Sequence, residues 1–333
     1  MKKMMIMLFC LLILTGCSYT IEKPEDLPQP KVPGDTETTK SNYVSYNGPL
    51  KVRGKDILNQ YNEKIQLKGI SSHGLQWFDY LITDENIKTM KSWGANVIRL
   101  AMYTKEGGYL DNRAIYDTLV KDIDLALAND MYVIIDWHIL SDNNPNNHKE
   151  EAKEFFNNIS TKYRYIPNII YEICNEPNGS TSWDDIKNYA NEIVPIIRKN
   201  SNSIIIVGTP NYSQDVDSVI GNRVGFENIM YALHFYAGTH KDDLREKAKK
   251  ALDDNVPIFV SEWGTSNADG NGGPDLNESN KWIDFINQYN LSYVNWSLAD
   301  KDEKSALLLP NNTKISDDTL SESGKYIKSI LSK

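Results

Sequence analysis

The chain has 333 residues, of which 40% are hydrophobic and 24% are charged, and its formal net charge at pH 7 is -9. An acidic chain repels nucleic acid and other anionic polymers, so we expect no nucleic-acid partner and favour a neutral substrate. Beyond the amino-terminal segment, the length is ordinary for one large α/β domain, which we expect to be a monomer.

Residues 1–17 have the pattern of an export signal. A basic start precedes an apolar stretch at 4–14, which is too short for an ordinary membrane-spanning helix. The segment Leu14-Thr15-Gly16-Cys17 resembles a bacterial lipobox, in which the cysteine is lipidated and becomes the first mature residue. We therefore expect an exported bacterial lipoprotein, anchored through Cys17 to a membrane at the cell surface or to the outer membrane; ordinary secretion is the alternative.

Residues 18–44 are rich in Pro, Thr, Lys and acidic residues and poor in large apolar side chains, which predicts a flexible linker. The folded domain is expected to occupy residues 45–333. Its one cysteine, Cys174, is expected to be a small buried apolar residue rather than a nucleophile.

Eight apolar runs recur through this domain at spacings suited to alternating strands and helices. They are continuous, as is typical of parallel strands that are buried on both faces. Together they predict an α/β fold, a (β/α)8 TIM barrel in a single catalytic domain. The runs are residues 65–70, 95–101, 132–137, 169–175, 204–207, 230–234, 258–262 and 293–296.

Helix signals lie between these runs. Thr83 is predicted to cap a helix that ends at Gly94, and Ser182 one that extends through residue 197. Asp242 is predicted to begin a helix that ends before residue 257. Pro195 lies inside the second of these helices and is expected to kink it or to end it early. No glycine-rich phosphate-binding motif follows any strand, which weakens a nucleotide-binding interpretation.

Two apolar runs end abruptly in a glutamate: residues 171–177 (YEICNEP) contain Glu176, and residues 258–264 (IFVSEWG) contain Glu262. The carboxyl ends of barrel strands meet at one mouth, where barrel enzymes hold their catalytic groups. A carboxyl in such a place is costly unless it is hydrogen-bonded or takes part in chemistry. Two of them indicate glycosidic bond cleavage, in which a protonated carboxyl donates to the leaving oxygen and an ionised one attacks or stabilises the anomeric carbon.

Polar and aromatic residues end most of the other strands, and aromatic faces beside hydrogen-bonding groups suit a sugar ring. This set consists of His73, Gln76, Trp77, Arg99, Asp136, Trp137, His138, Asn175, His234, Phe235, Tyr236, Trp263 and Trp296.

From about Tyr46 to the carboxyl terminus, the chain resembles glycoside hydrolase family 5, and specifically the bacterial endoglucanases of its second subfamily. The motifs that carry the resemblance are 67–77 (LKGISSHGLQW), Arg99 with 101–104 (AMYT), 135–142 (IDWHILSD), 175–179 (NEPNG), 234–240 (HFYAGTH), 261–265 (SEWGT) and 295–298 (NWSL). The resemblance implies a retaining endo-β-1,4-glucanase, a cellulase, that acts on cellulose and related β-glucans. It also implies Glu176 as the acid/base and Glu262 as the nucleophile.

The resemblance suggests roles for the surrounding residues. Arg99 and Tyr236 are expected to keep Glu262 ionised, and Asn175 to donate to the sugar 2-hydroxyl. His138 and His234 are expected to orient these groups. The expected substrate-binding residues are His73, Trp77, Tyr103, Trp263, Trp296, Lys301 and Glu303, with Trp296 flooring the subsite of bond cleavage and Trp77 stacking on a sugar towards the non-reducing end. The lead-in to Lys301, residues 298–300 (LAD), departs from the more polar one of the family.

Three alternatives remain. The substrate could be another β-glycan, such as mixed-linkage glucan, glucomannan, mannan or xyloglucan, because loops select substrates on a shared fold. The chain could be an inactive surface lipoprotein that binds glycans. It could also be a metal hydrolase that uses Asp136, His138 and His234, although these residues form no compact ligand motif. We expect neither a metal nor another cofactor.

Overall fold

The computed structural model describes residues 43–333 of the chain. The expected signal peptide and all but the last two residues of the expected linker lie outside this described part. Within it, no helix combines the length and the apolar character needed to cross a membrane.

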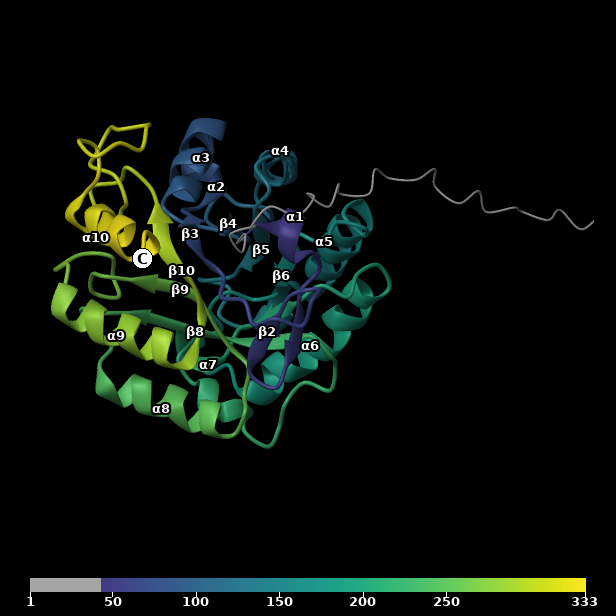
Figure 1. Ribbon diagram of the computed structural model, residues 1–333. Helices are drawn as coiled ribbons and strands as arrows, with labels where there is room; N and C mark the ends of the chain where they lie inside the picture. Colours follow the sequence, from purple (N-terminus) through teal and green to yellow (C-terminus); the bar gives the residue numbers. More distant parts are fainter. Residues whose placement is uncertain (1–42) are drawn as a thin grey trace, which may run out of the picture. The chain divides into compact units, whose positions relative to one another are not determined.

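Eight parallel strands close into a barrel, in the order β10-β3-β4-β5-β6-β7-β8-β9 (Figure 1). All eight predicted strands are present, and the predicted fold class is confirmed. The largest differences are at β3, which starts at Lys68, three residues after the expected start, and at β6, which ends at Glu172, three residues before the expected end. The strands are β3 (Lys68–Ser72), β4 (Val97–Tyr103), β5 (Tyr132–His138), β6 (Ile169–Glu172), β7 (Ile205–Val207), β8 (Ile229–Tyr236), β9 (Ile258–Gly264) and β10 (Ser292–Leu298).

Helices surround the barrel (Figure 1). The α-helices are α1 (Val44–Asn47), α2 (Leu75–Phe78), α3 (Asp84–Ser92), α4 (Ile115–Ala128), α5 (Lys149–Lys162), α6 (Trp183–Arg198), α7 (Pro210–Ser213), α8 (Asp242–Asp253), α9 (Leu276–Tyr289) and α10 (Glu322–Leu331). The 3₁₀ helices are η1 (Asp79–Leu81), η2 (Pro145–His148) and η3 (Val216–Val219), and a hairpin of β1 (Lys51–Arg53) and β2 (Asp56–Leu58) precedes the barrel.

The predicted helix starts are confirmed. Thr83 accepts a hydrogen bond from the Asn86 amide at the start of α3, and Ser182 forms a capping box with Asp185 at the start of α6. Pro195 lies in the last turn of α6, which ends three residues later at Arg198. The helix thus extends one residue beyond its predicted end, and Pro195 does not end it early.

The core forms two main layers. Apolar residues inside the amino-terminal half of the barrel, such as Tyr132, Met230 and Phe259, form one cluster. Residues that point outwards from the strands pack against the helices and form the other. Because successive strand residues point to opposite sides, the continuous apolar runs supply both layers. Barrel enzymes with such a filled interior hold their sites at the carboxyl-terminal mouth.

Candidate active site

A cavity of about 730 Å³ is lined by residues at the carboxyl ends of the strands and in the loops that follow. Arg99 and Asn175 are fully buried and are not among its lining residues, nor is Trp263. The predicted site residues that line it are His73, Trp77, Tyr103, His138, Glu176, His234, Tyr236, Glu262, Trp296, Lys301 and Glu303.

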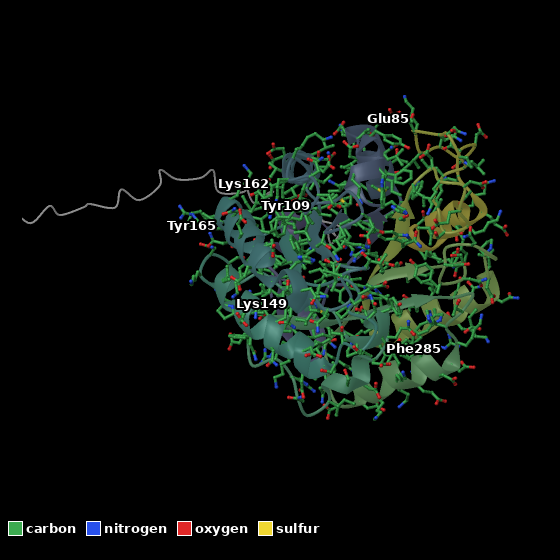
Figure 2. All side chains as sticks on the ribbon, turned by 180° about the vertical axis from the view of Figure 1, so that it is seen from behind. Glu85, Tyr109, Lys149, Lys162, Tyr165 and Phe285 are labelled. Atoms are coloured by element: carbon green, nitrogen blue, oxygen red, sulfur yellow. The ribbon has the colours of Figure 1, made fainter. Side chains whose placement is uncertain are left out.

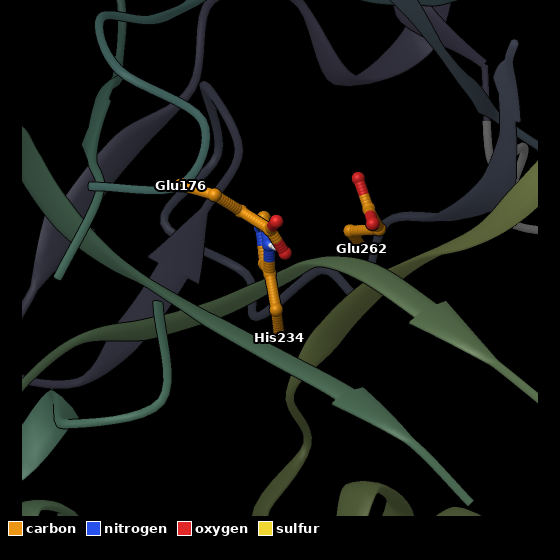
Figure 3. Close-up of side chains that lie close together, drawn as sticks. All are labelled: Glu176, His234 and Glu262. Atoms are coloured by element: carbon orange, nitrogen blue, oxygen red, sulfur yellow. Dashed lines mark hydrogen bonds and ion pairs between the residues drawn. The ribbon is translucent and has the colours of Figure 1, made fainter. Parts of the chain in front are cut away.

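The two glutamates that the sequence singles out face one another across this cavity (Figure 3). Glu262 belongs to β9, whereas Glu176 lies in the loop after β6. One carboxylate oxygen of each and one ring nitrogen of His234 lie within 4.8 Å of one another. Inverting glycosidases hold their carboxyls roughly 6.5–9.5 Å apart to admit a water, so this geometry favours direct attack by one carboxylate.

Glu262 accepts hydrogen bonds from two fixed donors. Arg99 Nη1 lies 3.1 Å from its Oε2, and the Tyr236 hydroxyl donates to its Oε1 at 2.7 Å. Burial opposes the charge on Arg99, but the neighbouring carboxylates of Asp136, Glu172 and Glu262 raise its pKa. The guanidinium therefore stays charged and, with Tyr236, stabilises negative charge on Glu262.

Glu172 is a member of this network that the sequence analysis missed. Its carboxylate accepts from Arg99 Nε at 2.7 Å and from the Ser261 hydroxyl at 2.7 Å. Burial opposes its ionisation, yet Arg99 and His234 lower the pKa of Glu172 to about 2. A charged residue in the middle of an apolar run was the signal that could have revealed it.

His234 connects this network to Glu176. Its Nδ1 lies 3.0 Å from Glu176 Oε1 and its Nε2 lies 2.9 Å from the Ser261 hydroxyl oxygen. Burial disfavours a charged ring, but Glu172 and Glu176 raise the pKa of His234 to about 9. At neutral pH both ring nitrogens therefore donate, which fixes the orientation of the Glu176 carboxyl.

His138 is held in the opposite protonation state. Burial and the Arg99 charge lower the pKa of His138 to about 3, so the ring is neutral. Its Nδ1 donates to Asp136 Oδ2 at 2.6 Å, and its Nε2 accepts from Asn175 Nδ2 at 3.2 Å. Asn175 Nδ2 also donates to the carbonyl of Ile139 at 3.1 Å, so the expected donation to a sugar hydroxyl requires the loss of one of these bonds.

Aromatic rings form one wall of the cavity. The Trp296 ring lies 4.9 Å from His73 and stacks on His138 at 5.3 Å between ring centroids. Tyr103 lies 4.1 Å from His138 and 5.1 Å from Trp77. Trp77 is 44% exposed, so its ring is available to a ligand. Near this wall, Lys301 forms an ion pair with Glu303, and both line the cavity.

Trp263 requires a correction. Its side chain is completely buried, stacked on Phe235 at 5.3 Å in the layer between barrel and helices, so it cannot bind a sugar in the cavity. The pairing of β9 with β8 shifts register between Phe259 and Glu262. This irregularity lets both Ser261 and Glu262 contact groups inside the barrel and turns Trp263 outwards.

Several cavity residues were not predicted because they do not lie at strand ends: Asn211 and Tyr212 belong to α7, and the others lie in loops. The full set is Glu106, Leu140, Asn211, Tyr212, Gln214, His240, Ala268, Asp269 and Gly270. Tyr212 is 43% exposed and has a left-handed backbone with φ of 58°; its neighbours Asn211 and Ser213 are also left-handed, each with φ of 56°. An aromatic residue shortly after β7 was a usable signal.

Glu176, His234 and Glu262 are the one group in the described part of the chain that is close enough to share a metal ion. The atoms that would bind the ion already form hydrogen bonds: those of His234 with Glu176 and Ser261, and those of Glu262 with Arg99 and Tyr236. A cation here would also meet the charge of Arg99 at close range. These residues fit acid/base chemistry better than metal binding.

Residues 58–302 match the family model described as cellulase (glycosyl hydrolase family 5). The chain belongs to glycosyl hydrolase family 5. This confirms the resemblance found in the sequence.

Family 5 relatives share much of this sequence. An endoglucanase of Clostridium saccharobutylicum is 51% identical over 292 residues, which cover 86% of this chain and 65% of that protein. Endoglucanase A of Evansella cellulosilytica is 50% identical over 273 residues, 80% of this chain and 56% of that protein. The chain thus spans somewhat under two thirds of the length of these relatives.

Solved family 5 structures share the fold. A cellulase from an Icelandic hot spring isolate is 39% identical, with a TM-score of 0.84 over 87% of this chain and 96% of that chain. The catalytic domain of a Thermobifida fusca endoglucanase, solved with cellotetraose, is 36% identical, with a TM-score of 0.84 over 87% of this chain and 99% of that chain.

Proposed function

We propose that the protein is a retaining endo-β-1,4-glucanase, with Glu262 as the nucleophile and Glu176 as the acid/base. The observation that carries this proposal is the pair of glutamates whose oxygens lie within 4.8 Å across the cavity. Their separation suits a double displacement through a covalent glycosyl-enzyme. The names of the relatives and the cellotetraose in a solved relative support a β-1,4-glucan as the substrate.

In the first step, Glu262 attacks the anomeric carbon while the bond to the leaving sugar breaks and Glu176 gives its proton to the leaving oxygen. Arg99 and Tyr236 stabilise the Glu262 carboxylate before the attack. In the second step, Glu176 takes a proton from a water, whose oxygen attacks the same carbon and releases Glu262.

The cavity walls supply the substrate contacts in this proposal. Trp296 floors the subsite where the bond breaks, and Trp77 stacks on a sugar towards the non-reducing end. Lys301 and Glu303 bind hydroxyls at the same end. A neutral polymer fits an acidic protein whose cavity exposes aromatic faces and few free charges.

The test is product analysis on carboxymethylcellulose, barley β-glucan and glucomannan side by side. A cellulase lowers the viscosity of the first two rapidly and releases cello-oligosaccharides whose new reducing end is first the β-anomer by NMR. Faster cleavage of glucomannan than of both glucans would favour a mannanase, and a first-formed α-anomer would overturn retention. No hydrolysis of any of the three would favour the glycan-binding alternative.

We also propose that the protein works from a bacterial membrane through a lipid on Cys17, which lies outside the described residues. The lipobox-like sequence supports this proposal, because it is the pattern in which the cysteine is lipidated. Several acyl chains on that cysteine would hold the protein on a membrane far more firmly than one chain. Cys17→Ala in the producing cell should move the protein out of the membrane fraction. Wild-type protein found wholly in the medium, with its first residue beyond Cys17, would contradict anchoring.

A further inference from the structure

Outside the cavity, a hydrogen bond joins two loops that are distant in the sequence. The Tyr80 hydroxyl, in η1 after β3, donates to Asp300 Oδ1 at 2.6 Å, in the loop after β10. The two residues are 220 positions apart, so only the closure of the barrel between β10 and β3 brings them together.

Each partner is close in sequence to a residue that lines the cavity. Tyr80 follows Trp77 by three residues, and Asp300 directly precedes Lys301; Trp77 and Lys301 line the cavity, whereas Tyr80 and Asp300 do not. The Phe78 ring lies 4.9 Å from His73 and 6.1 Å from Tyr80. A row of rings therefore leads from the cavity wall to Tyr80 outside it.

Tyr80 presents a fixed aromatic surface to solvent. It is 46% exposed, close to the 44% of Trp77. A single exposed tyrosine needs no explanation by itself. Here, however, the bond to Asp300 holds the ring in one orientation, so little side-chain entropy is lost when a ligand stacks on it. Among the described residues, no hydrogen bond or ion pair engages Asp300 Oδ2, which can accept from a sugar hydroxyl.

We propose that Tyr80 and Asp300 form a further sugar-binding subsite beyond Trp77, which only chains extending past Trp77 can reach. This rests on the proposed glucanase function and deepens it, because it adds a preference for longer substrates. Tyr80 supplies the stacking face, and Asp300 holds that face and accepts a hydroxyl.

The experiment measures kcat/KM on cellotetraose, cellopentaose and cellohexaose for the wild type and for Tyr80→Ala, Tyr80→Phe and Asp300→Ala. Tyr80→Ala should lower the ratio of the cellohexaose value to the cellotetraose value by about five-fold, the worth of one ring contact. Tyr80→Phe, which keeps the ring, should lower this ratio by less than half as much. Asp300→Ala should fall between them.

The matched control is Tyr165→Ala, since Tyr165 is an exposed ring on the outside of the molecule, before β6 (Figure 2). It should leave the ratio unchanged. If Tyr80→Ala and Tyr80→Phe lower kcat/KM equally on all three substrates, the pair only positions Lys301. If kcat/KM does not change on any substrate, the pair has no role in substrate binding. Either result overturns the proposal. Failure of the wild type to cleave any of the three refutes the glucanase function itself.

Discussion

Arg99 has no solvent exposure and contacts three carboxylates, with Asp136 at 3.0 Å, Glu172 at 2.7 Å and Glu262 at 3.1 Å. A buried charge of this kind is stable only because its partners are close and well oriented. Of these three, Glu262 also lines the cavity. Arg99 therefore links the folding of the barrel interior to the charge of the proposed nucleophile.

Rescue of glutamate variants by azide can test which glutamate is the nucleophile and which is the acid/base. Glu262→Ala should lose turnover on all natural substrates, and azide should restore reaction of an activated β-glycoside to give the α-glycosyl azide. Glu176→Ala should keep its first step with an aryl leaving group that needs no proton, and azide should then yield the β-glycosyl azide. NMR of the products decides, and the reverse pairing of variant and stereochemistry would contradict the assignment.

Because of His234, the free energy of unfolding should fall as the pH rises into the alkaline range. Burial opposes its charge, but Glu172 and Glu176 raise its pKa from 6.5 to about 9, so the folded state binds this proton more tightly than the unfolded state. The resulting stabilisation, on the order of 3 kcal/mol, is complete below pH 6.5 and is lost as the pH rises through 9.

Urea unfolding of the wild type and His234→Asn between pH 6 and 10 tests this. The free energy of unfolding of the wild type should fall towards that of the variant across this range. A constant difference between the two would show that the ring does not gain its proton in the folded state.

At the scale of a single element, α4 carries a buried carboxyl without a hydrogen-bond partner. Neither oxygen of Asp122 has one, and Lys121 Nζ lies 3.4 Å from Oδ1. Burial raises the pKa of Asp122 from 3.8 to about 7, and Lys121 offsets only part of this. The folded state thus favours the protonated acid, so stability is lost as the pH rises from 3.8 through 7.

Asp122→Asn should remove this loss, because the amide has the same shape and no charge. Its advantage over the wild type should grow by roughly 2–3 kcal/mol between pH 5 and pH 8, as measured by chemical denaturation. Asp117→Asn, on the exposed side of α4, is the matched control. An advantage that does not change with pH would mean that Asp122 is already ionised at pH 5.

At the scale of the whole molecule, the described fold starts close to residue 43. Val44 is buried and belongs to the apolar cluster inside the barrel, with Leu50 and Ile57. A chain that starts at Tyr43 should fold and retain wild-type rates on soluble oligosaccharides. A chain that starts at Ser45 loses the Val44 side chain and should be less stable by about 1–2 kcal/mol. Thermal unfolding compares the two, and equal stability would show that Val44 contributes nothing.

The sequence by itself determined the eight strands, the barrel and the placement of Glu176 and Glu262 at its mouth. Apolar runs buried on both faces are visible without a structure, because every residue of a parallel strand must be apolar unless it has a specific task. The motifs around His73, Asn175 and Trp296 are local in the same way, and they identified the family before any distance was known.

Only the tertiary structure decided what depends on register and on closure of the barrel. Simple alternation along β9 from Phe259 puts Trp263 inside, and the register shift reverses this. The contacts of Glu172 with Arg99 and Ser261 join three strands. The contact of Tyr80 with Asp300 joins the segments that follow β3 and β10, the first and last strands of the barrel. Such pairings arise from three-dimensional proximity between distant segments, which spacing along the chain does not encode.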